Sequence, residues 1–301
     1  MGIPLLWVGR IRAQRYVRQS WAQANPPSYD RGVKPYLAIC AVYRDEAPYL
    51  REWIEFHRHV GVERFFLYNN RSTDDHLGVL QPYIDAGIVV WEDFPEFPPQ
   101  LRCFEECLAT HRDDARWIAF IDVDEFLFSP TERPVSEILR EFEQHPAVGV
   151  NCLVFGTSGH QTPPPGLVIE NYRRRLSLDR PRNRVVKCIV DPTAVIAVGK
   201  SVHYFRYGPR GLAVTELHHP YRGETTGSLS VELLRINHYF TRSQEERERK
   251  LAAPRVDNGE MKNREGVEER DRRLNEEPDE TILTFAPALR AALGLEAVAG
   301  S

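Results

Sequence analysis

Apolar runs of strand length alternate with amphipathic segments through the first hundred residues of this chain. The expected strands are residues 36–42, 64–70 and 88–91. A segment with helical spacing follows each of the first two, and these segments end at Gly61 and Gly87. The β-α-β-α-β order predicts an α/β fold, with a mostly parallel central sheet flanked by helices.

A later apolar run, residues 117–128, carries Asp122, Asp124 and Glu125 at its centre. Burying an unpaired carboxylate costs several kcal/mol, so the strand should end near Asp122. Ligands bind at the carboxyl ends of strands in open α/β sheets. Asp122 and Asp124 could therefore bind one divalent cation, or the ribose and phosphates of a nucleotide. The alternative is an acidic turn that only caps the strand, and these residues alone do not distinguish it from a ligand site.

The rest of the chain continues the pattern with more irregular spacing. Further helices are expected near residues 100–112, 135–144, 243–249 and 287–295, and further strands near 148–156, 187–190 and 233–240. Ser243 is a plausible N-cap of its helix. We expect three parts: a basic and aromatic tail (1–35), an α/β domain (36–250), and a helical extension packed on the same domain (251–301).

Composition narrows the class of protein. Hydrophobic residues make up 42% of the 301 and charged residues 27%, as in a globular protein, and the net charge of −4 gives no general attraction to nucleic acid. The five cysteines are scattered and odd in number, which indicates reduced thiols and a cytoplasmic protein. No apolar run reaches the ~18–20 residues of a membrane span. Residues 1–21 could touch the inner face of a membrane, although a packed helix or a loose tail is the alternative.

In such a fold, the loops after successive strands converge on one edge of the sheet. This places Arg44 and Glu46, Asn70 with Asp74, and the acids at 122 and 124 beside one another. The set offers a cation for phosphate, an amide for base or ribose, and carboxylates for a metal that assists a diphosphate leaving group. No GxGxxG follows the first strand and no GxxxxGK[ST] occurs, so the dinucleotide and P-loop phosphate cradles are absent from the sequence.

Five stretches in this order carry a family resemblance. They are CAVYRDEAPYLREWIEFHRHVGVERFFLYNNRSTDD, WIAFIDVDEFLFSP, FGTSGHQTPPPGLVIENYRRR, VKCIV and LRINHYFTRSQEERERK. Together they resemble glycosyltransferase family 92, a relative of family 2 with the GT-A fold, over about residues 36–294.

The resemblance implies a metal-dependent, inverting transfer of a sugar, often galactose, from a UDP-sugar or similar donor to a glycan in polysaccharide biosynthesis. Mn²⁺ or Mg²⁺ would bind the DxD motif. By position, Asp124 matches the metal-binding acid, and Asp122 matches the acid nearer the ribose. The donor-nucleotide loops are matched by Arg44, Glu46, Asn70 and Asp74.

Later residues extend the candidate site. His238 matches a metal-binding histidine, with His203 as its competitor and a structural histidine at a strand end as the alternative. Lys187 is the best later cation for the diphosphate, unless it is a solvated surface lysine. His160 could touch donor or acceptor, or have no such role.

Inverting transfer also needs a general base, normally a carboxylate. Glu170 is our first choice for this base and Asp191 our second, although either could be a surface acid. Residues 173–175, three arginines, could meet an anionic acceptor or form a solvated face. Two other functions stay open: a nucleotidyltransferase acting on sugar phosphates, and a non-catalytic glycan-binding relative. The sequence does not indicate the oligomeric state.

Overall fold

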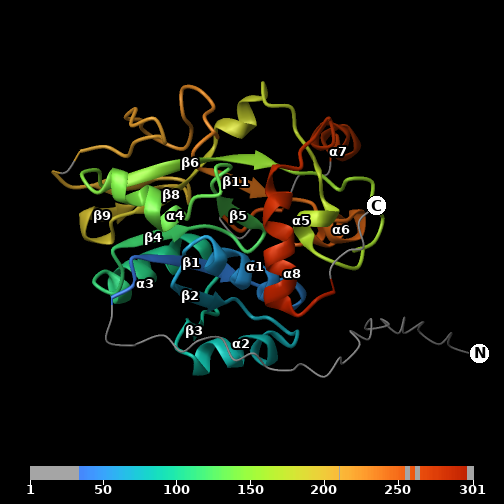
Figure 1. Ribbon diagram of the computed structural model, residues 1–301, viewed down its shortest axis with the longest axis horizontal. Coiled ribbons are helices and arrows are strands. Elements are labelled where there is room, and N and C mark those ends of the chain that lie inside the picture. The colour runs from blue at the N-terminus through green and yellow to red at the C-terminus, as the bar shows by residue number, and fades with distance from the viewer. Residues whose placement is uncertain (1–33, 210, 255–257, 262–264, 297–301) are drawn as a thin grey trace, which may run out of the picture.

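The computed structural model describes residues 34–209, 211–254, 258–261 and 265–296 of the chain. Most of the expected N-terminal tail, including residues 1–21, lies outside this part. In chain order the helices and strands are β1 (Leu37–Tyr43), α1 (Ala47–His59), β2 (Arg64–Asn69), α2 (His76–Asp85), β3 (Val89–Asp93), α3 (Gln100–His111), β4 (Trp117–Phe120), β5 (Glu125–Phe128), α4 (Val135–Ile138), β6 (Ala147–Val154), α5 (Val168–Asn171), β7 (Arg174–Arg175), β8 (Val186–Val190), β9 (Val195–Val198), β10 (Phe205–Tyr207), β11 (Arg235–His238), α6 (Gln244–Ala252), α7 (Val267–Leu274), β12 (Glu277–Pro278) and α8 (Ala286–Leu293) (Figure 1). Short 3₁₀ helices are η1 (Leu139–Phe142), η2 (Pro181–Arg184), η3 (Pro192–Ala194) and η4 (Thr281–Phe285).

The central sheet has eight strands in the order β3-β2-β1-β4-β8-β6-β11-β5. The pairs β1–β2, β2–β3, β1–β4 and β6–β11 are parallel, and β4–β8, β6–β8 and β5–β11 are antiparallel. Only β5 and β8 thus run against the other six strands. The sheet is mixed but mostly parallel in direction, as the pattern of the first hundred residues predicts.

Strand β6 bends the sheet because it pairs with two different neighbours in succession. Residues 147–151 pair with β8, and residues 152–154 pair with β11. The bend explains how β4 and β5 can be joined by residues 121–124 alone. Five residue steps span at most about 17 Å, whereas four strand spacings in a flat sheet span about 19 Å. The acidic turn therefore lies where the two halves of the bent sheet approach each other.

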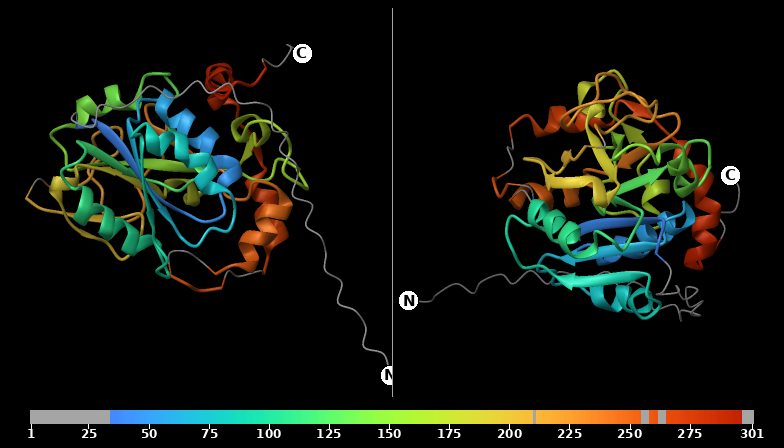
Figure 2. Two further views of the ribbon diagram at one scale, coloured as in Figure 1. Left: turned by 90° about the horizontal axis from the view of Figure 1, so that it is seen from below. Right: turned by 90° about the vertical axis from the view of Figure 1, so that its left-hand side faces the viewer.

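Helices cover both faces of the sheet (Figure 2). Alternate residues of β1 point to opposite sides. Leu37, Ile39 and Ala41 join the apolar core under α1 and α2, whereas Ala38 and Cys40 join the core under α3. All five cysteines are buried and unpaired.

One expected element differs from the structure in detail, and several others were not expected. Residues 135–144 form two short pieces, α4 and η1, because the helix tightens into a 3₁₀ turn after one turn. Strand β4 ends just before Asp122, as expected; that the chain then returns as β5 on the far side of β11 was not predicted. The small strands β7, β10 and β12 and the helices α5 and α7 were not predicted from the pattern.

The C-terminal segment packs on the same core. The Phe285 ring, just before α8, lies 5.6 Å from the rings of Phe56 and Phe128, and α8 runs beside α1 (Figure 1). Ser243 caps α6 through a capping box with Glu246. Within the ranges that the structure describes, no helix is both long and apolar enough to cross a bilayer.

The buried Glu52 of α1 ties down the segment that follows β6. Its carboxylate accepts the backbone N–H groups of Val168 (2.9 Å) and Ile169 (3.3 Å) at the start of α5. Burial raises the pKa of Glu52 to about 7, although these two hydrogen bonds oppose the shift. Because the folded-state pKa lies above the usual 4.5, the stability that Glu52 contributes is full below about pH 4.5 and is lost as the pH rises through about 7.

We predict opposite outcomes for two substitutions of Glu52. Glu52→Ala leaves two buried N–H groups without an acceptor and should lower the free energy of unfolding by about 2 kcal/mol. Glu52→Gln resembles the protonated carboxyl, so its stability relative to wild type should rise between pH 5 and pH 8, by on the order of 2 kcal/mol. Urea unfolding at both pH values measures this, and a pH-independent difference between Gln and wild type would contradict it.

Candidate functional site

The loops after β1 and β2 are bonded to each other at one edge of the sheet. Asp45 accepts the backbone N–H of Thr73 (2.7 Å), and the Asp45 N–H donates to Ser72 Oγ (2.9 Å). Asp74 accepts the N–H of Ala47 (2.7 Å), the first residue of α1. The structure thus brings together the two loops that the sequence placed side by side.

The other predicted donor-loop residues divide into a buried and an exposed one. Asn70 is buried, and its side-chain amide donates to the carbonyls of Phe94 (2.7 Å) and Glu96 (2.8 Å). It therefore joins the end of β2 to the segment after β3. Arg44 is about half exposed beside Asp45, and its guanidinium is open to solvent. Of the two, only Arg44 has its head group in position to meet a solvent-borne ligand.

The turn at 121–124 is held by one buried ammonium group. Lys187 Nζ of β8 lies 2.8 Å from Asp122 Oδ2 and 3.2 Å from Glu125 Oε2. The other oxygen of Asp122 accepts a hydrogen bond from Gln100 at the start of α3. Burial alone would lower the pKa of Lys187, but Asp122 and Glu125 outweigh it and hold that pKa above its usual value. Lys187 is thus charged, and its positive charge compensates the carboxylates of Asp122 and Glu125.

Asp124 faces two further basic groups. Its Oδ2 lies 2.5 Å from Lys250 Nζ of α6, and its Oδ1 lies 3.5 Å from His238 Nε2 at the end of β11. Burial would raise the pKa of Asp124, but Lys250 and His238 outweigh burial and keep the pKa well below its usual range. Lys250 also donates to the Phe240 carbonyl (3.0 Å). Asp124 is therefore an ionised carboxylate with a cation already beside it.

Glu125 lies behind His238, close to its ring but without a hydrogen bond to it. The two residues are register partners on β5 and β11, and His238 Nδ1 lies 3.4 Å from Glu125 Oε1. Glu125 is completely buried, and burial raises its pKa to about 7 against the opposing effect of Lys187. A proton on Nδ1 facing Glu125 leaves the lone pair of Nε2 facing Asp124. The placement resembles the carboxylate–histidine pairs found behind metal-binding histidines, without the hydrogen bond that fixes such a histidine.

The donor atoms fit a divalent cation only in part. Asp124 Oδ1 and His238 Nε2, 3.5 Å apart, are close enough to share one ion, and carboxylate with imidazole suits Mn²⁺. Across the described ranges, no group of three His, Cys, Asp or Glu residues is placed to hold a metal. A cation here would complete its coordination with phosphate oxygens and water, as Mg²⁺ does in many nucleotide enzymes.

The other predicted histidines make backbone contacts. His160 Nε2 lies 3.0 Å from the Asn171 carbonyl, and the His160 carbonyl accepts the N–H of Gln244 at the start of α6. His203 Nδ1 lies 2.9 Å from the Val186 carbonyl. Burial, helped by the nearby Lys187, lowers the pKa of His203 to about 4. Of the two histidines proposed for the metal, only His238 faces Asp124.

The candidate bases lie apart from this cluster. Glu170 of α5 faces α8, where its carboxylate is 3.5 Å from Arg290. Asp191 is buried at the opposite end of β8 from Lys187, where it accepts the Thr193 N–H (3.0 Å) and pairs with Arg116 (3.0 Å). The arginines 173–175 contact the C-terminal segment 275–280, through bonds to the carboxylates of Glu277, Asp279 and Glu280 and to backbone carbonyls.

Sequence reasoning missed two basic residues, Lys250 and Arg242. Arg242 is buried, donates to Glu46 (2.6 Å), and stacks over the Tyr49 ring with its Cζ 3.7 Å from the centroid. Burial raises the pKa of Glu46, although Arg242 opposes it. The alternating charges of α6 suggested a solvated helix, so Lys250 was not predicted to be part of the site. The signal available was that the family-like stretch LRINHYFTRSQEERERK contains both residues and ends at Lys250.

Comparison with known proteins identifies the family. Residues 36–267 match the model of glycosyltransferase family 92, and the chain belongs to this family. The mixed sheet with helices on both faces is the GT-A arrangement that the resemblance implies, so the predicted family and fold class are confirmed.

Individual relatives match part of the chain. A family 92 protein of rice (Oryza sativa subsp. japonica) is 31% identical over 194 residues, which are 62% of this chain and 33% of the rice protein. Galactan β-1,4-galactosyltransferase GALS2 of Arabidopsis thaliana is 30% identical over 106 residues, 32% of this chain and 20% of that protein. The crystal structure of S. aureus TarS 1–349 superposes with a TM-score of 0.35 at 11% identity, covering 60% of this chain and 52% of that one. The chain spans about a third or less of the length of these curated relatives.

We predict that Lys187→Met destabilises the protein much more than Lys200→Met. The first change leaves Asp122 and the buried Glu125 without their shared cation, which should cost about 3–5 kcal/mol of unfolding free energy. Lys200 is exposed, so its replacement should change stability by less than about 0.5 kcal/mol. Denaturant unfolding of the three proteins compares them. Equal stabilities would show that Lys187 does not hold the turn.

Proposed function

We propose that this chain is a metal-dependent, inverting glycosyltransferase that transfers a hexose from a UDP-sugar to a glycan. The observation that supports it best is the cluster of Asp124, His238 and Lys250 at the edge of the sheet where the β1 and β2 loops meet. Family membership supplies the reaction class. The cluster offers what a nucleotide diphosphate needs: an ionised carboxylate and imidazole for a cation, and an ammonium group for phosphate.

In this proposal, the nucleotide binds along the loops after β1 and β2. Arg44 supplies an exposed guanidinium at the first loop, while Asp45, Asp74 and Asn70 keep the two loops in place. Asp122 is about 29% exposed at the turn and can accept from ribose hydroxyls while Lys187 and Gln100 fix its position. Glu46 lies behind these groups, paired with Arg242. Lys187 supports the site through Asp122 and does not itself need to reach the diphosphate.

We propose that Asp124 and His238 hold Mn²⁺ or Mg²⁺ and that Glu125 orients His238. The cation, when bound, supplies positive charge that stabilises the departing diphosphate. In the structure, Lys250 lies against the Asp124 oxygen, so its ammonium must share or yield that oxygen when a cation binds. A short movement of the Lys250 side chain, which is about 30% exposed, would leave it beside the phosphates as a second positive charge.

The acceptor hydroxyl needs a base, and Glu170 stays our proposal for it. Its present neighbour is Arg290, 3.5 Å away, so it would act only if the segment 156–172 moves toward the acidic turn. The matched galactan β-1,4-galactosyltransferases of Arabidopsis support galactose as the donated sugar and a polysaccharide as the acceptor. The five buried, unpaired cysteines support a reducing compartment such as the cytoplasm as the place of action.

We predict that Asp124→Asn abolishes Mn²⁺-dependent hydrolysis of UDP-galactose without unfolding the protein. Loss of the cation's charge stabilisation, several kcal/mol, corresponds to a decrease in kcat/KM of about 100-fold or more. A screen of nucleotide sugars with and without Mn²⁺ measures the slow transfer to water, and circular dichroism checks the fold. Asp113→Asn, at an exposed position, is the matched control. Unchanged turnover in Asp124→Asn would disprove the metal role of Asp124.

We also predict that Lys250→Met separates metal binding from turnover. Without the competing ammonium at Asp124 Oδ2, the protein alone should bind Mn²⁺ several-fold more tightly, as measured by paramagnetic resonance titration. The rate of UDP-galactose hydrolysis should fall about tenfold or more, since the diphosphate loses one cation. Arg249→Gln, on the exposed neighbouring position, should change neither quantity. Unaltered Mn²⁺ affinity in Lys250→Met would show that Lys250 does not compete for Asp124.

A further inference from the structure

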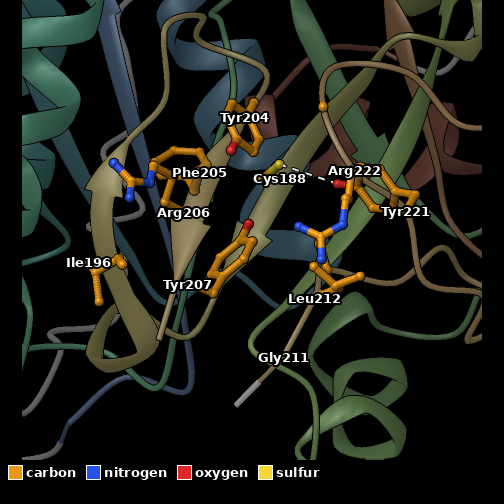
Figure 3. Close-up of a pocket in the computed structure, with 12 residues that line it drawn as sticks. Cys188, Ile196, Tyr204, Phe205, Arg206, Tyr207, Gly211, Leu212, Tyr221 and Arg222 are labelled. Carbon is orange, nitrogen blue, oxygen red and sulfur yellow. Dashed lines mark hydrogen bonds between the residues drawn. The ribbon is translucent and has the colours of Figure 1, made fainter. Parts of the chain in front are cut away.

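A pocket of about 160 Å³ lies on the face of β8 opposite the acidic turn. One wall is the β9–β10 hairpin, the other is the segment 211–223, and Cys188 of β8 forms the floor (Figure 3). The side chains that matter most are those of Tyr204, Tyr207, Tyr221, Arg206 and Arg222.

The aromatic part of the pocket is firmly built into the fold. Tyr221 lies against β6 at Gly149, where a Cβ atom would be 2.2 Å from the Tyr221 hydroxyl. That hydroxyl lies 3.5 Å from the Cys188 sulfur. The Tyr207 hydroxyl is shielded from solvent, and its polar neighbour is the thiol of Cys188, a weak hydrogen-bond partner.

The charge of the pocket is positive in a chain whose net charge is −4. Arg222 is exposed and extends across the pocket toward Tyr207, whereas the exposed Arg206 on the other wall points its guanidinium away from Tyr207 (Figure 3). Within the described part of the chain, no acidic side chain lines the pocket, and neither arginine forms an ion pair. A guanidinium without a carboxylate partner is suited to bind a carboxylate or phosphate in bidentate fashion.

The pocket and the acidic turn are linked through two neighbouring segments. On β8, Lys187 faces Asp122, whereas the next residue, Cys188, faces the pocket. The segment containing His203 and Tyr204 passes from one side to the other: Lys187 is close enough to His203 to lower its pKa, and Tyr204 lines the pocket. The pocket and the acidic turn are therefore neighbours on opposite faces of β8.

We propose that this pocket binds one acidic sugar residue of a glycan, a ring bearing a carboxylate, as a distal part of the acceptor site. The inference rests on the proposed glycosyl transfer. The tyrosine rings offer flat apolar faces to the C–H groups of the sugar ring, and Arg222 binds the carboxylate. The volume is below the ~300–1,000 Å³ of pockets for drug-sized ligands, so it takes a single ring.

Calorimetric titration with two tetrasaccharides of equal length tests the proposal. Tetragalacturonate carries carboxylates and β-1,4-galactotetraose is neutral; without any nucleotide, the acidic one should bind at least tenfold more tightly. Arg222→Gln should weaken tetragalacturonate binding about tenfold or more. Arg112→Gln, at an exposed position on another surface, should leave binding unchanged.

Several outcomes would overturn the proposal: no binding of tetragalacturonate at millimolar concentration, equal binding of the two tetrasaccharides, or equal effects of Arg222→Gln and Arg112→Gln. Stronger, Arg222-dependent binding of anionic lipid vesicles or of an RNA oligonucleotide would also overturn it, by reassigning the pocket. Circular dichroism excludes misfolding of the variants.

The same proteins separate this proposal from the proposed reaction. Hydrolysis of UDP-galactose with Mn²⁺ needs no acceptor and should be equal in wild type and Arg222→Gln. Arg222-dependent tetragalacturonate binding without any nucleotide-sugar turnover would support the pocket and disprove the reaction. If the protein hydrolyses UDP-galactose but binds tetragalacturonate equally well with and without Arg222, only the proposed role of the pocket would be disproved.

Discussion

One buried ammonium group, that of Lys187, makes the acidic turn possible. A completely buried carboxylate such as Glu125 is costly without a partner, and Asp122 adds a second negative charge close by. Lys187 compensates both because β8 runs antiparallel between β4 and β6 and so presents its side chain beneath the turn. With that charge balance in place, Asp124 is left to the groups arriving from β11 and α6. The three acids thus have different partners because different elements pack beside each of them: β8 beside Asp122 and Glu125, and β11 and α6 beside Asp124.

The site combines segments that are distant in sequence because the sheet bends along β6. That bend carries β11 and β5 back toward β4, so that His238 meets both Glu125 and Asp124. Helix α6 then closes the site from outside the sheet through Lys250. The basic groups of the cluster, Lys187, His238 and Lys250, therefore come from β8, β11 and α6. None of these three elements directly follows β4, the strand that leads into the turn.

The sequence predicted the elements with strong periodicity and the convergence of loops that depends on them. The first five elements, the end of β4 near Asp122, and Ser243 as an N-cap all follow from local patterns. Tertiary charge balance was not predictable, because Lys187 in a strand and Lys250 in a charged helix have the same local signature as solvated lysines. Nor does any local pattern show that residues 126–128 belong to a strand paired with β11.

The short link between β4 and β5 also bears on how this chain can vary. Residues 121–124 must cross the bend with almost no slack, so an insertion would push the acids out of the site and a deletion would pull β5 from its pairing with β11. The spacing of the two aspartates is thus dictated by the path of the backbone as well as by ligand chemistry, and changes in chain length should accumulate everywhere in this protein before they reach that turn.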